Sequence, residues 1–322
     1  MTKETLRIVY MGTPDFAVES LRVLVEGGYN VVAVVTMPDK PMGRHGSVLQ
    51  PSPVKQYAME HGLKVMQPEK LKDPAFIEEL KALNADLQVV VAFRMLPEAV
   101  WSMPRCGTIN AHASLLPKYR GAAPINWAII NGEKETGVTT FMLKHEIDTG
   151  DIIDQVRIPI GEEDNAETVH DKLMVLSGQL VVKTVDSIID GTFKTTPQDA
   201  VEGTEVTQAP KIFRDTCRID WNKPALAVRN FIRGLSPYPA AWTTLGGKSV
   251  KIFDSTVSME TSCTNDDNTE AGAIRTDGKK FIQVRTADAW LDIKTLQLEG
   301  KKKMPVEDLL RGLQLPENAF FQ

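Results

Sequence analysis

Two polar side chains stand close together in the stretch Thr108–Pro124, which reads TINAHASLLPKYRGAAP. Asn110 and His112 are two residues apart in a segment typical of a buried strand, and alternate residues of a strand project to the same face. An amide NH2 and a protonated imidazole can both donate hydrogen bonds to an oxygen on which negative charge develops. The pair is therefore suited to stabilising the intermediate of an acyl transfer.

A candidate acid for the same chemistry is Asp148, in the segment HEIDTGDI. A carboxylate beside an imidazole favours the protonated form of the ring and fixes its orientation. It can also help to remove the proton that an attacking amine loses, directly or through water. The residue types alone leave a second interpretation open, in which Asn110 and His112 only make structural hydrogen bonds.

Three other kinds of site lack their sequence patterns. The segment HEIDTGDI contains neither HExxH nor DxDxDG, so no metal site is expected. MGTPDF follows an apolar strand but lacks the later glycines of GxGxxG, which argues against a nicotinamide site. Ser114 in AHASL does not stand in a GxSxG elbow, so a hydrolase with Ser114, His112 and Asp148 as its triad is a weaker alternative.

The composition is that of an ordinary globular protein, with 42% hydrophobic and 25% charged residues. No basic leader is apparent and no apolar run approaches the roughly 20 residues that span a bilayer, so neither secretion nor membrane insertion is expected. Cys106, Cys217 and Cys263 lie far apart without a CxxC pair, which fits a cytoplasmic location and argues against disulfides. The net charge is −5, but from Lys211 onward 17 basic residues stand against 14 acidic ones.

The elements that must position these side chains alternate through the first 190 residues. Apolar strands are expected at 6–12, 30–36 and 87–93. Their alternation with amphipathic helices predicts an α/β fold with a Rossmann-like, mostly parallel sheet that is covered on both faces. Thr13 and Pro14 predict the cap and first turn of a helix over 14–28. Residues 37–53 are predicted to form a long loop.

The length of 322 residues favours two domains. We predict a catalytic domain at 1–190, a linker at 191–209 and a C-terminal domain at 210–322. The linker is rich in Thr and Pro and poor in large apolar residues. Short strands separated by turns after Gly246 predict that the C-terminal domain is a small, OB-like β-barrel.

The stretch from Ile109 to Ile152 closely resembles the core of the folate-dependent formyltransferases, whose pattern is Asn-x-His-x-Ser-Leu-Leu-Pro, an Arg-Gly turn and an Asp-x-Gly-Asp loop. Four further segments resemble the members of that family that act on tRNA: GTPDFA, TMPDKPMGRHGSVLQPSPVK, RIDW and GLSPYPAAW. The resemblance covers nearly the whole chain. It implies transfer of the formyl group of 10-formyltetrahydrofolate to the α-amino group of methionyl initiator tRNA.

The resemblance also implies roles for individual residues. Asn110 and His112 would polarise the formyl carbonyl, and Asp148 would orient His112 and assist proton transfer. The implied folate pocket consists of Ser114, Leu115, Leu116 and Pro117, of Phe93, Arg94, Met95 and Leu96, and of His145 and Glu146. The chain has AFRMLP where many members read AYGxILP, and Ala113 and Glu146 stand where glycine is common. These departures concern the shape of the pocket and spare the three reacting groups.

Contacts with tRNA are implied at two places. Arg44 and Lys40, in the 37–53 loop, would touch the acceptor stem, and Lys301, Lys302 and Lys303 would extend the contact along the phosphates. The protein is expected to act as a monomer. Two alternatives remain besides the hydrolase: a formyltransferase acting on a nucleotide sugar or glycinamide ribonucleotide, and a non-catalytic tRNA-binding protein.

Overall fold

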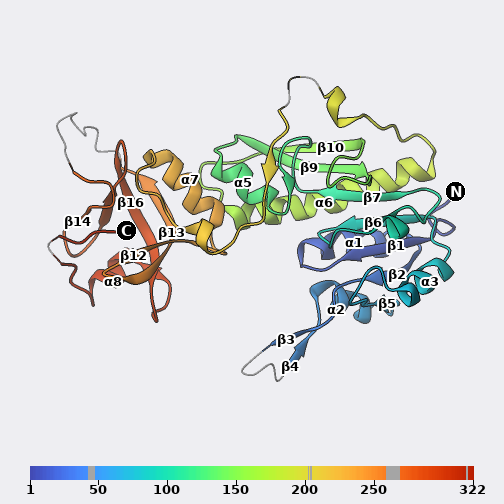
Figure 1. The fold of residues 1–322 in the computed structure, drawn as a ribbon, viewed down its shortest axis with the longest axis horizontal. Helices are drawn as coiled ribbons and strands as arrows, with labels where there is room; N and C mark the ends of the chain where they lie inside the picture. The colour runs from blue at the N-terminus through green and yellow to red at the C-terminus, as the bar shows by residue number, and fades with distance from the viewer. Residues whose placement is uncertain (43–47, 202, 204, 259–268, 317) are drawn as a thin grey trace. The chain divides into compact units, whose positions relative to one another are not determined.

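Figure 1 shows the computed structural model, which describes residues 1–42, 48–201, 203, 205–258, 269–316 and 318–322. The chain forms two compact units. The first comprises residues 1–121, 135–158 and 170–209, and the second comprises residues 122–134, 159–169 and 210–322. Both units are discontinuous in the sequence. The limits 1–190, 191–209 and 210–322 stay predictions of domain extent.

Within the described residues, a sheet of seven strands forms the centre of the first unit. The strands lie in the order β10 (Ile152–Pro159), β9 (Glu135–Met142), β7 (Thr108–His112), β6 (Leu87–Val91), β1 (Ile8–Gly12), β2 (Val31–Val35) and β5 (Val65–Met66). The strands from β5 to β7 pair in parallel, whereas β9 is antiparallel to β7. The predicted Rossmann-like, mostly parallel sheet is confirmed.

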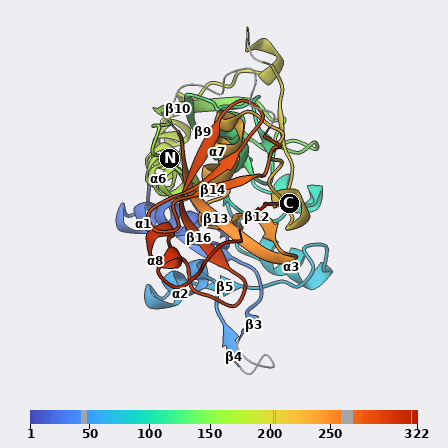
Figure 2. The same cartoon turned by 90° about the vertical axis from the view of Figure 1, so that its left-hand side faces the viewer.

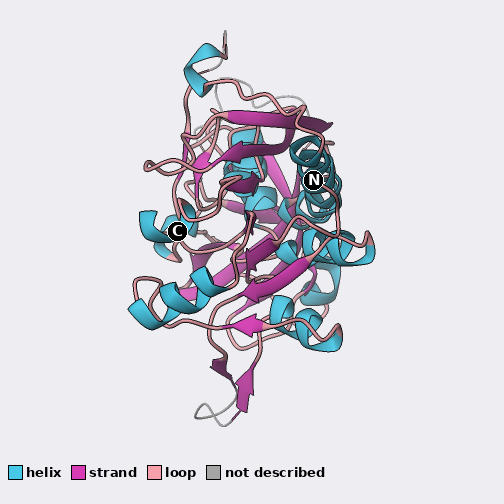
Figure 3. Ribbon diagram, turned by 90° about the vertical axis from the view of Figure 1, so that its right-hand side faces the viewer, coloured by secondary structure: helices cyan, strands magenta, loops and turns pink. Residues whose placement is uncertain are grey.

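The central strands β1 and β6 are buried along their whole length because helices cover both faces of the sheet, as Figure 3 shows. On one face, Val9 and Met11 of β1 join a core with side chains of α3 (Pro74–Ala82) and α4 (Glu98–Trp101). Because successive side chains of a strand alternate between its faces, Tyr10 points the other way.

The other face of the sheet is covered by α1 (Phe16–Glu26) and α6 (Ala166–Ile189), which Figure 2 labels. The hydroxyl of Tyr10 donates a hydrogen bond to a backbone carbonyl of α1. The two helices contact each other through small residues, where the hydroxyl oxygens of Ser20 and Ser177 lie 3.2 Å apart. This contact explains why the small polar residues Ser20 and Ser177 stand on the otherwise apolar, buried faces of α1 and α6.

The start of α1 differs from the prediction. The helix begins at Phe16, and the N–H groups of Ala17 and Val18 donate to the carbonyls of Pro14 and Asp15. This tight turn satisfies donors that a capping side chain would otherwise accept. Thr13 therefore does not cap the helix, and its buried hydroxyl has no hydrogen-bond partner among the described residues.

The expected loop at 37–53 is also partly wrong, because it contains a short antiparallel hairpin. Its strands are β3 (Lys40–Met42) and β4 (Val48–Gln50), and α2 (Pro53–Glu60) follows. At the base of the hairpin, Lys55 Nζ lies 2.7 Å from Asp39 Oδ2. Hydrogen bonds from Lys55 and Gln67 lower the pKa of the Asp39 carboxyl.

The predicted linker packs on the first unit. Thr196 pairs with Ile152 of β10, and a turn of 3-10 helix follows at Gln198–Ala200. At its end β11 (Gln208–Ala209) lies parallel to β8 (Arg120–Gly121). The segment is thus tied to the sheet and to the turn that follows β7.

The second unit contains an antiparallel sheet, which Figure 2 shows in orange and red. Its strands lie in the order β12 (Ala241–Leu245), β13 (Lys248–Val257), β16 (Trp290–Leu298), β15 (Ile282–Arg285) and β14 (Ile274–Thr276), with β17 (Met304–Pro305) beside β16. The end of the chain closes this sheet. Thr244 and Gln322 exchange backbone hydrogen bonds of 3.0 Å, and the Phe321 N–H donates to Gly272 at 2.8 Å. The C-terminal residues therefore join the β12 edge to the β14 edge, as a barrel requires.

Helices α5 (Pro124–Ile130), α7 (Ala225–Leu235) and α8 (Val306–Leu310) belong to the same unit. The first two pack closely because Gly234 has no side chain: a Cβ there would lie 2.6 Å from a side-chain carbon of Ile130. The Asn126 amide donates to the Gly234 carbonyl at 2.7 Å. Across the described part of the chain, none of the helices is long and apolar enough to span a membrane.

We predict that Phe321→Ala lowers the free energy of unfolding of the second unit by about 3–5 kcal/mol. The Phe321 ring is 3% exposed and stacks on Trp221 with centroids 5.8 Å apart. The control is Phe213→Ala, because Phe213 is 58% exposed and its loss should cost less than about 0.5 kcal/mol. Urea titration followed by tryptophan fluorescence measures both, and equal losses would contradict closure by a buried C-terminus.

Candidate active site

Asn110 and His112 lie in β7, near its carboxyl end. His112 is buried and lies opposite Thr139 of β9, and Asn110 is half-buried and lies opposite Phe141. As expected from the spacing, alternation along the strand places both residues on one side of it. The carboxyl end of a parallel strand is where open α/β sheets present their binding residues.

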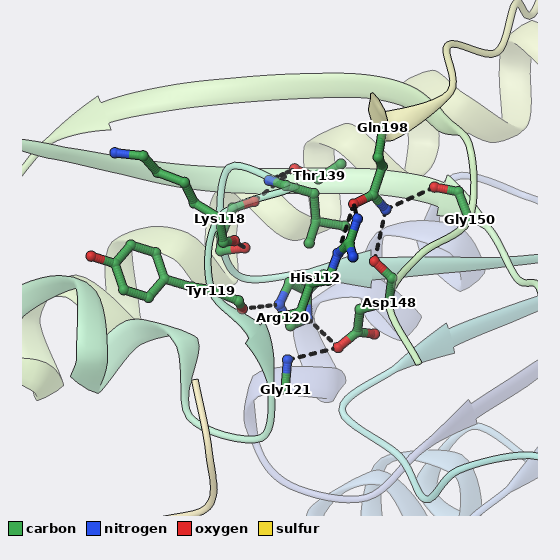
Figure 4. A network of polar contacts seen from close by, with 11 residues as sticks. His112, Lys118, Tyr119, Arg120, Gly121, Thr139, Asp148, Gly150 and Gln198 are labelled. Atoms are coloured by element: carbon green, nitrogen blue, oxygen red, sulfur yellow. Dashed lines mark hydrogen bonds and ion pairs between the residues drawn. The ribbon is translucent and has the colours of Figure 1, made fainter. Parts of the chain in front are cut away.

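The His112 ring is held from both sides, as Figure 4 shows. Its Nε2 donates to the Tyr119 carbonyl oxygen at 2.8 Å, and its Nδ1 lies 3.9 Å from Asp148 Oδ2. A carbonyl oxygen only accepts, so Nε2 carries a proton in either charge state of the ring. Nδ1 is therefore the ring nitrogen that is left to face the carboxylate.

Asp148 is presented by a turn with an uncommon backbone. Its φ of 53° lies in the left-handed region. Its Oδ2 accepts the Gly121 N–H at 2.9 Å, which fixes the carboxylate next to the turn after β7. Gly150 is required in this loop, because a Cβ there would lie 1.6 Å from the Met142 carbonyl oxygen. The carboxylate of Asp148 thus lies beside the imidazole of His112, as predicted from the sequence.

The turn Ser114–Pro117 follows β7 directly and is stabilised from within. Ser114 is fully buried, and its hydroxyl donates to the Lys118 carbonyl at 2.6 Å. Thr139 donates to the Ser114 carbonyl at 2.7 Å and accepts the Leu116 N–H at 3.1 Å. Leu116 is buried and Leu115 half-buried. The Ser114 hydroxyl is thus occupied by the turn, which weakens the hydrolase alternative.

The segment Phe93–Leu96 lies beyond β6, the strand next to β7. Arg94 donates to the carbonyls of Pro68 and Glu69, and burial lowers the pKa of its guanidinium. Leu96 enters the core, whereas Met95 is 73% exposed. Arg94 therefore anchors the segment, and Phe93 and Met95 are its more accessible apolar groups.

The remaining predicted residues that the structure describes are exposed. His145 and Glu146 stand in the loop before Asp148, with His145 Nδ1 3.8 Å from Glu98 Oε2. Lys40 is exposed on β3 of the first unit. Lys301, Lys302 and Lys303 are exposed between β16 and β17 of the second unit. Arg44 lies outside the described residues.

Sequence reasoning missed two residues of this site, both in the predicted linker. Gln198 Nε2 donates to the Asp148 carbonyl at 2.7 Å. The Thr207 hydroxyl accepts the N–H of Tyr119, whose carbonyl holds His112, at 2.8 Å. No sequence pattern marked either residue, because the composition of the segment indicated only a connection.

The site has the parts for acyl transfer to an amine. His112 and Asn110 can donate to a developing oxyanion, and Asp148 can stabilise the imidazolium. In the described part of the chain, no cluster of three or more His, Cys, Asp or Glu side chains is arranged to bind a metal ion.

Comparison with protein families gives two matches. A model described as formyl transferase matches residues 6–185. A model described as the formyl transferase C-terminal domain matches residues 211–314. Together they span both the α/β sheet and the antiparallel sheet.

Individual relatives agree with these matches. Methionyl-tRNA formyltransferase from Phocaeicola vulgatus is 63% identical over 325 residues, covering 99% of each chain. The Parabacteroides distasonis protein of the same name is 61% identical over 316 residues, covering 98% of each. Among solved structures, HypX from Aquifex aeolicus in complex with tetrahydrofolic acid has a TM-score of 0.64 at 18% identity, over 98% of this chain and 51% of that one. This chain thus spans about half of HypX, and the likeness concerns the fold.

We predict that Thr139→Val lowers the free energy of unfolding by about 1–3 kcal/mol, because the Leu116 N–H and the Gln155 amide lose a buried acceptor. Thr139→Ser is the matched control, since it removes a methyl group and keeps the hydroxyl. Thermal and urea unfolding measure the two variants. A loss in Thr139→Val no larger than the loss in Thr139→Ser would contradict the hydrogen-bonding role.

Proposed function

This chain belongs to the formyl transferase family, and from that membership and the site geometry we propose that it formylates methionyl initiator tRNA. The formyl group would come from 10-formyltetrahydrofolate and would be transferred to the α-amino group of the esterified methionine. The observation that carries the proposal is the imidazole of His112 facing the Asp148 carboxylate, two residues after Asn110. The names of the full-length relatives supply the acceptor.

In the proposed reaction, the amine nitrogen attacks the formyl carbon and the carbonyl oxygen becomes an oxyanion. The amide of Asn110 and Nδ1–H of His112 donate to that oxygen, since Nε2 is already used by the Tyr119 carbonyl. Asp148 faces the imidazole and accepts the proton of the attacking amine, directly or through water. The oxyanion then re-forms the carbonyl, the bond from the formyl carbon to N10 of the folate breaks, and N10 takes up the proton that Asp148 accepted from the amine.

The folate pocket is proposed at the segments around the carboxyl ends of β6 and β7. The turn Ser114–Pro117 would contribute mainly backbone groups, since the Ser114 and Leu116 side chains are buried. Phe93, Arg94, Met95 and Leu96 would line one side of the pterin, and His145 and Glu146 would lie at its opening. A flat pterin suits an apolar slot with a few backbone donors and acceptors.

The tRNA contact is proposed at Lys40 and Arg44, and along Lys301, Lys302 and Lys303. Exposed lysines suit phosphates, whose contacts supply most of the sequence-independent affinity. A monomeric enzyme acting in the cytoplasm is part of the same proposal. The direct test is incubation with methionyl-tRNA and 10-formyltetrahydrofolate, followed by ester hydrolysis and measurement of formyl-methionine. An amino sugar nucleotide and glycinamide ribonucleotide serve as competing acceptors, and preference for either would overturn the choice of tRNA.

His112→Ala is expected to lower kcat by roughly 100- to 10,000-fold, the usual contribution of a general acid or base. Binding of tetrahydrofolate should change little, because the loss concerns the transition state. Single-turnover formylation measures the rate and fluorescence titration measures the binding. His61→Ala, at an exposed position after α2, is the control and should retain the wild-type rate.

Asn110→Ala is expected to lower kcat by roughly 100- to 1,000-fold, the effect of losing one donor to an oxyanion. Asn110→Asp tests the same donor at constant size, and it should be no more active than the alanine variant because a carboxylate repels the oxyanion. A wild-type rate in either variant would remove Asn110 from the catalytic group.

Replacing Lys301, Lys302 and Lys303 together by Gln should weaken tRNA binding and reduce the slope of log K against log salt by up to about three. Lys81→Gln, on the exposed side of α3, is the single-charge control. Filter binding of methionyl-tRNA over a range of salt concentrations measures the slope. An unchanged slope would exclude the lysine run from the phosphate contact.

A further inference from the structure

The buried amide of Gln198 has a partner for each of its hydrogen-bonding positions. Its Nε2 donates to the carbonyls of Asp148 at 2.7 Å and Gly150 at 2.8 Å. Its Oε1 accepts from Arg120 Nε at 3.0 Å and Nη2 at 2.7 Å. The side chain is 5% exposed, and Figure 4 shows it between the Asp148 loop and Arg120.

This set of partners selects an amide. Two carbonyl oxygens require two donors, and a guanidinium requires an acceptor. A carboxylate would repel the two carbonyls, and an ammonium would repel Arg120. Gln198 therefore matches the two carbonyls and the guanidinium at once. A residue that only connected two segments would not need to be an amide.

The contacts bear directly on the placement of Asp148. Its left-handed backbone, φ 53°, is strained for a residue with a side chain and persists only where the surroundings hold it. Gln198 donates to the carbonyls of Asp148 and Gly150, on either side of Thr149. It also accepts from Arg120, the residue that precedes Gly121. The Gly121 N–H is the donor to the Asp148 carboxylate at 2.9 Å. Gln198 thus ties together the two segments that set the direction of that carboxylate.

We propose that Gln198 is a positioning residue that keeps the Asp148 carboxylate opposite Nδ1 of His112. The inference rests on the proposed formyl transfer for its kinetic consequence, whereas its structural consequence stands by itself. It assigns a part in the reaction to a segment outside the strand and loop that carry the reacting groups. Gln198 acts through Asp148 and does not touch substrate.

The structural test is hydrogen exchange in the 146–151 loop, compared between wild type and two variants. Gln198→Glu keeps the acceptor for Arg120 and removes the donors to the two carbonyls, and Gln198→Met removes both. Both variants should exchange faster in this loop than wild type. Gln208→Met is the matched control, since Gln208 lies in the same segment with an exposed side chain. This measurement does not depend on the substrate, so it tests Gln198 even if the proposed function fails.

The kinetic test separates positioning from loss of stability. Gln198→Glu should lower kcat by about 10- to 100-fold, as expected for a misplaced catalytic group, with KM for both substrates little changed. In an Asp148→Asn background the same change should have almost no further effect, because it acts through the carboxylate. Thermal unfolding identifies variants that do not fold.

Two results would overturn the proposal. One is an exchange rate in the 146–151 loop that is unchanged in folded Gln198→Glu and Gln198→Met. The other is an equal fold-loss of kcat from Gln198→Glu in the wild-type and the Asp148→Asn backgrounds, since that would show that Gln198 acts independently of the carboxylate. Absence of formylation by the wild-type protein would instead reject the proposed function.

Discussion

The hydrogen bond from His112 Nε2 to the Tyr119 carbonyl oxygen decides which nitrogen of the ring is left for chemistry. With Nε2 occupied by this bond, Nδ1 is the ring nitrogen left for chemistry, and it lies 3.9 Å from Asp148 Oδ2. Tyr119 itself has a left-handed φ of 61°, and its N–H is accepted by Thr207. The orientation of the imidazole therefore depends on a backbone carbonyl in a strained turn, and on the segment that holds this turn in place.

Burying so many polar groups is costly unless each finds a partner. The fold meets this requirement because the polar side chains at the end of β7 find partners in the backbone carbonyls of the turn that follows the strand. Thr139 on the neighbouring strand bonds to the turn after Ser114, and Gln155 donates to the Leu116 carbonyl at 2.8 Å. Each of these side chains bonds to main chain, so the position of the reacting residues is transmitted through the backbone. Such a network is rigid because few of its members can rotate away without losing a partner.

Local sequence patterns were enough to predict what lies within one strand or one loop. Asn110 and His112 could be placed on one face because strand alternation is strict. The predicted cap of α1 is wrong because the carbonyls of a tight turn, and not the hydroxyl of Thr13, accept the first N–H groups of the helix. The strands at 40–42 and 48–50 fall inside the predicted loop because three residues are too few to show the alternation of a strand. Closure of the barrel by the last residues depends on pairing between distant segments, which periodicity does not report.

Gln198 shows the same limit at the site itself. In the sequence it is a polar residue in a Thr- and Pro-rich stretch, and such stretches usually connect domains. Its importance arises only when residues 120, 148 and 150 are brought together, at separations of 48 residues or more from it along the chain. A segment that merely connected two units could vary freely in sequence and length. One that also satisfies buried carbonyls must keep its register against β8 and β10, so the pairing of Thr196 with Ile152 and of residues 208–209 with β8 becomes a condition for the alignment of Asp148.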